Sequence, residues 1–252
     1  MKIRPSPLTI VSPIYPFVVI LLLWEVLHIL LGARLIPAPL TVLLVLGKMA
    51  AGGELWLHLG VSSLRIGVGL LSALLFSVPL GITIGVSTRA DRFLSPLLYT
   101  LYPLPKIAFL PIFMVLFGLG NSSKIILIWT VIVFQITIAA RDGIKEISPA
   151  QIKALRVLGL SKLQFFSHLY LPSSLPRIFS ALRLSLGISI SVLFFAENYA
   201  TTYGIGHLVM NSWIMVDYPR MFAGILSVSL LGLLLFRLID RLEARLCPWV
   251  RL

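Results

Sequence analysis

Apolar and polar residues alternate in long blocks along this chain of 252 residues. Six blocks are apolar enough to cross a lipid bilayer as helices, at about 14–31, 64–86, 94–116, 125–140, 178–199 and 221–238. Each holds roughly 16–23 residues, close to the length that a helix needs to cross the hydrocarbon core. The pattern predicts an all-α membrane protein of about six transmembrane helices, with residues 1–252 forming a single domain.

The block at 14–31 follows two basic residues and raises the question of a cleaved signal peptide. The apolar run continues to about Leu31 and no small-residue cleavage site follows it, so we expect an uncleaved, additional N-terminal helix. The next segment, 32–59, is rich in turn residues and too polar to cross the bilayer. We expect it at the outer surface, with a short helix around Val42, Leu43 and Leu46.

The block at 94–116 contains Pro103, Pro105 and Pro111, with Lys106 among them. Proline removes a backbone donor and distorts a helix. Such irregular backbone is tolerated at membrane depth only where protein or a water-filled cavity covers it. The sequence therefore predicts a distorted third span that is covered in this way.

A polar, basic block from Lys153 to Pro172 separates the fourth and fifth spans. In a chain with 58% hydrophobic and 12% charged residues, such a block must lie outside the lipid. One helix is expected at 149–158, ending near Gly159 as a C-cap, and a second from the Ser161 cap to Phe166. A partner surface is expected to bury the apolar side chains, although the protein's own surface or the bilayer interface is an alternative. These side chains are Leu155, Leu158, Leu163, Phe165 and Phe166.

The net charge of +12 limits the partners of the chain. In so apolar a chain, basic residues more often flank membrane spans than bind nucleic acid, and no nucleic-acid-reading motif is present. With the N-terminus inside, most Lys and Arg residues, including Lys2 and Arg4, fall on the cytoplasmic side. This bias predicts that both termini and the loop at 141–177 are cytoplasmic. The cations placed outside, or at the outer interface, are Arg34, Lys48, Arg65, Lys124 and Arg220.

Three charged residues, Lys106, Arg183 and Glu197, fall within the apolar blocks. Charges at membrane depth usually face a partner or a cavity. Lys106 is either a cationic element in a path for anions or half of a structural ion pair, with Glu197 or Glu25 from another helix. Arg183 lies about 21 Å from Glu197 along one helix at ~1.5 Å per residue, so these two are not expected to pair.

Catalytic and metal-binding signals are not evident in the sequence. Cys247 is the single cysteine, so neither an internal disulfide nor a cysteine-based metal site can form. The histidines are scattered, and no Ser/His/Asp or metal-ligand cluster stands out. The glycine-rich loop of P-loop ATPases is missing, so the chain is expected to be neither an enzyme nor a holder of ATP.

The block from Lys153 to Pro172 resembles the cytoplasmic motif of ABC-importer permeases, which reads Glu-Ala-Ala, three residues, Gly, nine residues, Ile-x-Leu-Pro. Here it reads Lys153-Ala154-Leu155, then Gly159, then Leu169-Tyr170-Leu171-Pro172. Lys153 thus replaces the acidic first residue. Further stretches, among them LIPAPLTV, FGLGNSSKI and AENYATTYGIGHL, are similar to permease subunits of the sulfonate/nitrate/taurine type, over about 37–246.

The resemblance implies a type I ABC-importer transmembrane domain in the inner membrane, forming a homodimer around the substrate pathway. It implies two cytoplasmic subunits that bind ATP and Mg²⁺, and an extracytoplasmic substrate-binding protein. The implied substrate is a small or organic anion such as a sulfonate, taurine, nitrate or bicarbonate. A neutral vitamin precursor or heterocycle is the alternative, and a self-sufficient secondary transporter or channel, or a membrane scaffold, is a rival function. The implied coupling residues are Lys153, Ala154, Leu155, Leu158, Gly159, Phe165, Leu169, Leu171 and Pro172.

Overall fold

The computed structural model describes residues 15–32 and 34–251, and its regular elements are helical throughout these ranges. Lys2 and Arg4, on which part of the charge argument depends, lie outside them. The elements are α1 (Tyr15–Leu31), α2 (Pro39–Ala51), α3 (Glu54–Val86), α4 (Thr88–Leu101), η2 (Lys106–Phe109), α5 (Leu110–Phe117), α6 (Asn121–Lys145), α7 (Pro149–Val157), α8 (Lys162–Phe165), η3 (Phe166–Tyr170), α9 (Leu171–Ala196), α10 (Ile205–Ile214), α11 (Tyr218–Leu246) and η4 (Pro248–Arg251).

Each of the six predicted spans coincides with helix over most of its described residues. Four helices are long and apolar enough to cross a membrane: α3, α6, the continuous helix Lys162–Ala196, and α11. The proline-rich third span is a pair, α4 and η2–α5, bent by 82°. α1 has 17 residues and none of them is buried, which places it at the short end of spanning lengths. The predicted distortion of the third span is confirmed, because α4 ends just before Pro103.

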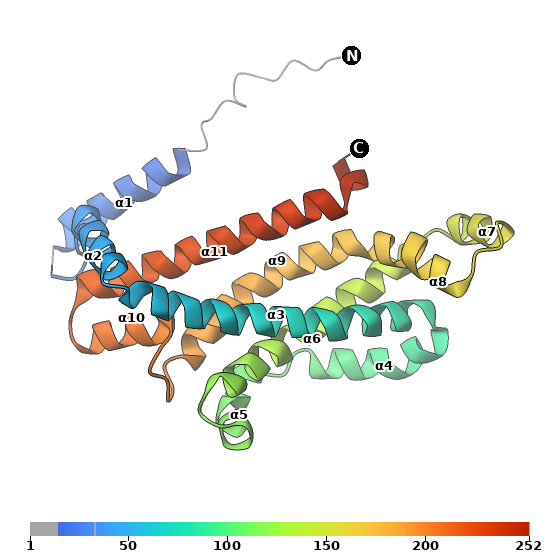
Figure 1. Ribbon diagram of the computed structural model, residues 1–252, viewed down its shortest axis with the longest axis horizontal. Helices are drawn as coiled ribbons and strands as arrows, with labels where there is room; N and C mark the ends of the chain where they lie inside the picture. Colours follow the sequence, from blue (N-terminus) through green and yellow to red (C-terminus); the bar gives the residue numbers. More distant parts are fainter. Residues whose placement is uncertain (1–14, 33, 252) are drawn as a thin grey trace, which may run out of the picture.

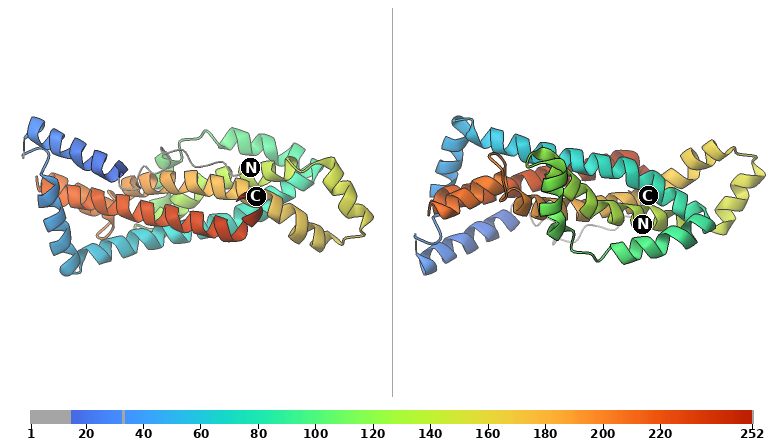
Figure 2. Two further views of the ribbon diagram at one scale, coloured as in Figure 1. Left: turned by 90° about the horizontal axis from the view of Figure 1, so that it is seen from above. Right: turned by 90° about the horizontal axis from the view of Figure 1, so that it is seen from below.

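The long helices lie side by side along one axis of an elongated bundle (Figure 1). α7 and α8 project at one end, whereas α2 and α10 lie at the other. Both views in Figure 2 show α1 diverging from the bundle. The core between α3, α6 and α9 is built from large aliphatic side chains, including Ile66, Ile128, Ile132, Ile136 and Leu186.

Two glycines on α3 allow its close approach to α6. A Cβ atom on Gly81 would come within 2.5 Å of the carbonyl oxygen of Thr137, and one on Gly85 within 2.6 Å of Ile144 Cβ. Small residues four apart let helix backbones approach closely in lipid, where packing drives association. Gly81 and Gly85 therefore form a close contact between α3 and α6.

Three element boundaries differ from the sequence-based expectation. α3 begins at Glu54 rather than near residue 64. Hydropathy missed the first part of this helix because it carries polar side chains, of which His58 and Arg65 are buried inside the protein. The segment between the fifth and sixth predicted spans contains α10, which the hydropathy pattern did not predict. Gly204 and Gly206 at its start favour a loop, although its apolar face packs against α11 and α2 in a buried cluster.

The third difference lies after α8. The expected helix end at Phe166 is wrong, since the chain continues through η3 into α9 without interruption. η3 is a π-helical turn. Pro172 has no N–H to donate to the carbonyl of His168, and a π turn accommodates such a gap within a helix.

Candidate functional site

The α7–α8 segment (residues 148–172) projects beyond the ends of the neighbouring long helices (Figure 1). Each of its short helices begins with a capping box. Ser148 Oγ accepts from Gln151 N at 3.3 Å, and Ser161 Oγ accepts from Gln164 N at 3.4 Å. Both Gln side chains bond back to the backbone N–H of the serine that caps them. Local sequence thus sets the starts of both helices before any tertiary contact is made.

Gly159 makes the turn between the two helices. Its φ of +70° is left-handed, and a Cβ atom placed there would meet nothing within 4 Å. The predicted role of Gly159 as the residue that ends the first helix is confirmed. A side chain here would therefore strain the backbone without any clash inside this chain.

The sequence-predicted coupling residues divide into two groups. Leu155, Phe165, Leu169 and Leu171 pack in a cluster with buried aliphatic side chains at the ends of α3 and α6, and Pro172 is half-buried. These residues therefore pack on the protein's own surface. They hold the α7–α8 segment in place.

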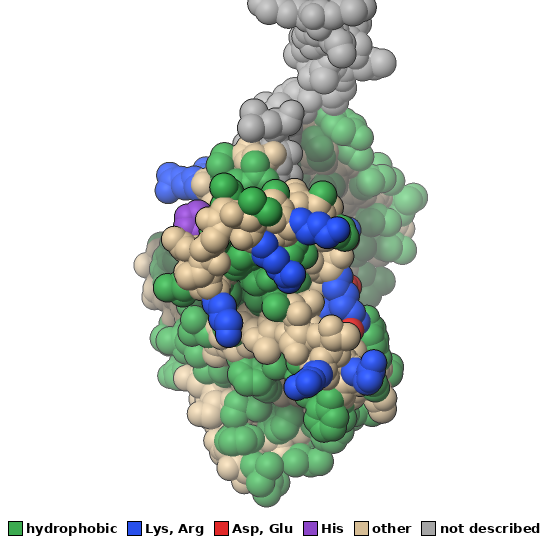
Figure 3. Space-filling model, turned by 90° about the vertical axis from the view of Figure 1, so that its right-hand side faces the viewer, with side chains coloured by type: hydrophobic (Ala, Val, Ile, Leu, Met, Phe, Trp, Pro, Cys, Tyr) green, Lys and Arg blue, Asp and Glu red, His purple; other side chains and the backbone are tan. Residues whose placement is uncertain are grey.

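The other group lies at the apex of the segment and is open to solvent. Lys153, Ala154, Leu158 and Gly159 are exposed, with Leu158 at 72%. Two further apolar side chains belong to this group: Val157 is 87% exposed and Leu163 is 76% exposed. Figure 3 shows Lys and Arg side chains gathered on this end of the molecule, with hydrophobic side chains between them.

Val157 was not singled out from the sequence. Its signal is its position, immediately before Leu158 at the end of a short helix, where neither residue can reach the core below. Ion pairs join the helices beside the segment. Arg141 and Lys145 of α6 lie 2.7 and 2.6 Å from the carboxylate of Asp91 on α4, and Arg177 of α9 pairs with Glu146 at the end of α6.

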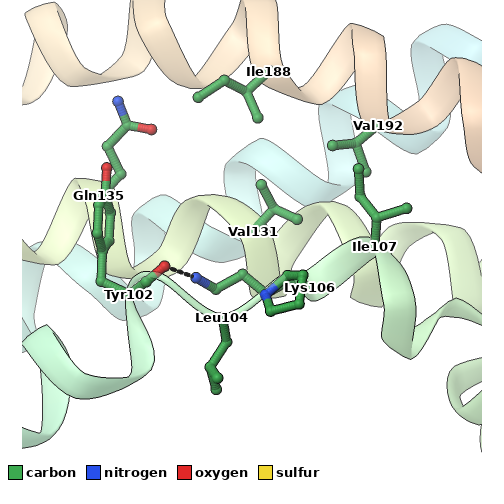
Figure 4. A pocket seen from close by; sticks show the side chains of 9 residues that line it. Tyr102, Leu104, Lys106, Ile107, Val131, Gln135, Ile188 and Val192 are labelled. Atoms are coloured by element: carbon green, nitrogen blue, oxygen red, sulfur yellow. Dashed lines mark hydrogen bonds between the residues drawn. The ribbon is translucent and has the colours of Figure 1, made fainter.

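Lys106 lies in the bent third span and lines a cavity of about 340 Å³. Its ammonium donates to the carbonyl of Tyr102 and lies 4.9 Å from the centre of the Phe134 ring. Figure 4 shows Gln135, Val131 and other side chains of α6 and α9 around the same cavity. Among the described residues, Lys106 has no carboxylate partner. The ion pair considered for it is therefore not formed in this conformation.

Arg183 links α9 to α11. Its Nε atom lies 2.8 Å from the Asp240 carboxylate, and its guanidinium also contacts Glu243. The expectation that Arg183 and Glu197 do not pair is confirmed. Arg183 therefore holds two spans together, which favours a structural role over a place in a pathway.

Glu197 pairs with Arg65, a residue that the sequence analysis had placed outside the spans as an outer cation. The two side chains are 1% and 5% exposed, and Arg65 Nη1 lies 2.7 Å from Glu197 Oε1. Ser62 Oγ donates to the same carboxylate at 2.8 Å, and Gly206 N donates at 2.8 Å. Arg65 donates in turn to Asn121 Oδ1 and to the carbonyl of Tyr203. The cluster joins α3, α6, α9, α10 and the loop before α10.

The loop closes over this cluster at Gly204. Its φ is +142°, and a Cβ atom there would lie 2.4 Å from the Glu197 carboxyl carbon. Lys124, also expected at the outer side, is fully buried beside the loop and donates to the carbonyl of Leu119 at 2.6 Å. One signal could have revealed the cluster: Ser62 and Arg65 are three residues apart on one face of an apolar helix.

The apolar helices, the bent span and the projecting polar segment define a multi-pass helical membrane protein. Residues 77–247 match the family of the binding-protein-dependent transport system inner membrane component. The chain belongs to this family, as the motif resemblance predicted. It is a permease subunit of an ABC importer in the inner membrane.

Two relatives are similar to this chain over most of its length. The taurine transport system permease protein TauC of Escherichia coli (strain K12) is 35% identical over 195 residues, which are 77% of this chain and 71% of TauC. The putative aliphatic sulfonates transport permease protein SsuC of Bacillus subtilis (strain 168) is 32% identical over 92% of this chain and 84% of SsuC.

A solved structure shows the same fold. The inward-facing MetNI methionine ABC transporter superposes with a TM-score of 0.61 at 19% identity, covering 77% of this chain and 96% of the matched chain. The likeness confirms the type I ABC-importer fold expected from the sequence.

Proposed function

We propose that this permease forms the translocation pathway of its importer as a homodimer, with two cytoplasmic ATP-binding subunits docked on its α7–α8 segments. An extracytoplasmic binding protein delivers substrate at the opposite end, near residues 199–206. ATP and Mg²⁺ are held by the ATP-binding subunits, so this chain carries no cofactor and performs no hydrolysis. Both termini and the α7–α8 segment lie in the cytoplasm.

One observation carries the docking proposal. Val157, Leu158 and Leu163 are exposed at the apex of a segment whose base is packed against the ends of α3 and α6. Three exposed aliphatic side chains on a capped and anchored turn are costly in water unless a partner covers them. The membership of the chain in a binding-protein-dependent transport family makes the ATP-binding subunit the expected partner.

We propose a small or organic anion as the substrate. The relatives named for taurine and aliphatic sulfonates support this class, and so does Lys106 beside a cavity with no carboxylate partner among the described residues. A cation at membrane depth that faces a cavity is a candidate for contact with a passing anion. A neutral heterocycle is the alternative, and competition in the uptake assay separates the two.

The mechanism follows from two conformations of the dimer. ATP binding and the loaded binding protein each favour one of the two states, and transport follows from the alternation between them. The α7–α8 segment passes the movement of the ATP-binding subunit to the spanning helices, because it is continuous with α9 and its base packs against the ends of α3 and α6.

The test is uptake by proteoliposomes that contain the permease, its ATP-binding subunit and its binding protein. Radiolabelled taurine, an aliphatic sulfonate, nitrate and a neutral pyrimidine are each offered separately, and each is also used unlabelled as a competitor of the others. Uptake that needs ATP, the ATP-binding subunit and the binding protein supports the proposal. Uptake without the ATP-binding subunit would make the chain a secondary transporter or channel. Uptake of the pyrimidine alone would overturn the anion assignment.

A further inference from the structure

Cations beside the α7–α8 segment differ in pairing from those within it. Beside the segment, on α6 and α9, Arg141, Lys145 and Arg177 are paired with carboxylates of this chain. At the apex, Lys153, Arg156 and Lys162 are exposed, and within 15–32 and 34–251 none of the three forms a salt bridge.

The sequence explains why the apex cations lack partners in this chain. No Asp or Glu occurs between Glu146 and Glu197, so the whole apex and the first turns of α9 carry only positive charge. Like charges packed near an exposed apolar surface repel one another, and a surface of opposite charge relieves this repulsion on binding. Lys153 also stands where the resembled motif has Glu.

We infer that the α7–α8 apex docks in a groove of the ATP-binding subunit with an apolar floor for Val157, Leu158 and Leu163 and a rim of Asp and Glu facing Lys153, Arg156 and Lys162. This inference rests on the proposed docking of the ATP-binding subunit and adds the charge of the surface that it presents. The geometry favours a protein over lipid headgroups, because the apex projects past the ends of the spanning helices (Figure 1).

The rim also determines which subunit fits. A groove lined with basic side chains would repel this apex, so the permease discriminates between ATP-binding subunits by charge as well as by shape. Charged rims act mainly on association rate and salt dependence, whereas the apolar floor supplies the burial that holds the complex.

The experiment measures the affinity of the full-length permease in nanodiscs for the purified ATP-binding subunit of the same importer. Lys153→Glu, Arg156→Glu and Lys162→Glu are tested singly and together. The matched control is Lys48→Glu, the same charge change on α2 at the opposite end, where the side chain is also exposed. A separate variant, Val157→Asp, tests the apolar contact.

We expect each apex reversal to weaken binding by about tenfold, the triple variant to abolish it, and Lys48→Glu to leave it unchanged. Wild-type affinity should fall as salt rises from low to high ionic strength. A Lys substitution of one rim carboxylate on the ATP-binding subunit should restore binding of one apex reversal.

Two outcomes would overturn the acidic rim and leave the proposed docking of the ATP-binding subunit intact. The apex reversals could leave the affinity within twofold while Val157→Asp abolishes it, which would mean a neutral groove. Alternatively, their effect could appear in nanodiscs of anionic phosphatidylglycerol and vanish in phosphatidylcholine, which would mean that the cations bind headgroups. If Val157→Asp also binds normally, the proposed docking itself is wrong.

Discussion

The buried pair of Arg65 and Glu197 gives the sharpest stability prediction. We consider Glu197→Gln, which keeps the size of the side chain and removes its charge. The Glu197 carboxylate accepts hydrogen bonds from Arg65, Ser62 and the backbone of Gly206, all at 2.7–3.0 Å. After the substitution the Arg65 guanidinium stays buried without its counter-charge.

The magnitude follows from burial. Removing one partner of a buried ion pair costs about 3–5 kcal/mol, because the remaining charge is left uncompensated away from water. At roughly 2–4 °C per kcal/mol for a chain of this size, the unfolding midpoint should fall by about 6–20 °C. The matched control is Glu54→Gln, whose partner Arg220 lies at the same end of the bundle. That pair is 37% exposed on each side, so its loss should cost at most about 1 kcal/mol.

Cys247 provides the assay. It is the single cysteine of the chain, it is 1% exposed, and burial raises the pKa of its thiol. Because the thiolate is the reactive form, a thiol-specific fluorescent dye should label Cys247 only as the protein unfolds. The midpoint of labelling during a thermal ramp in detergent then compares the wild type, Glu197→Gln and Glu54→Gln.

The reasoning fails if Glu197→Gln and Glu54→Gln lower the midpoint by the same few degrees. A second check is the double variant of Glu197→Gln with Arg65→Met. Residues in direct contact should show a coupling of about 1–3 kcal/mol, so the double variant should be clearly more stable than the sum of the single effects predicts. Simple additivity would mean that the pair contributes nothing as a pair.

Three further predictions concern single positions. Gly159→Val should uncouple uptake from ATP hydrolysis, because a β-branched residue at φ +70° costs about 1–2 kcal/mol. Gly159→Asn should retain most activity. Equal, normal uptake by both variants would contradict the role of the turn. Lys106→Met should lower anion uptake at least severalfold in proteoliposomes without changing the unfolding midpoint, and unchanged uptake would remove Lys106 from the pathway. Gly81→Ala should destabilise the bundle by about 1–3 kcal/mol, because the added Cβ atom meets the Thr137 carbonyl. Gly67 lies on the same helix with open space around it, so Gly67→Ala should be neutral or stabilising. The thermal labelling assay measures both variants.

Several features of the fold could be predicted from the sequence because they depend on neighbours along the chain. The six apolar blocks, the two capped helices and the turn at Gly159 follow from hydropathy, capping and a left-handed glycine. The break of the third span follows from the missing donors of its prolines. The motif spacing from Gly159 to Pro172 was likewise a local signal, and it indicated the family.

Other features needed the tertiary structure because they join distant residues. Arg65 and Glu197 are 132 positions apart, and only the packing of α3 against α9 brings them within 2.7 Å. Burial also differs among the apolar residues of the α7–α8 segment. Leu155 and Phe165 pack at its base, whereas Leu158 is exposed at its apex, because only the base meets other helices. The sequence by itself determined which segments are helical and which block lies outside the lipid. The tertiary structure alone decided which charges are buried in pairs and which side chains are left for a partner, because burial depends on what the other helices cover.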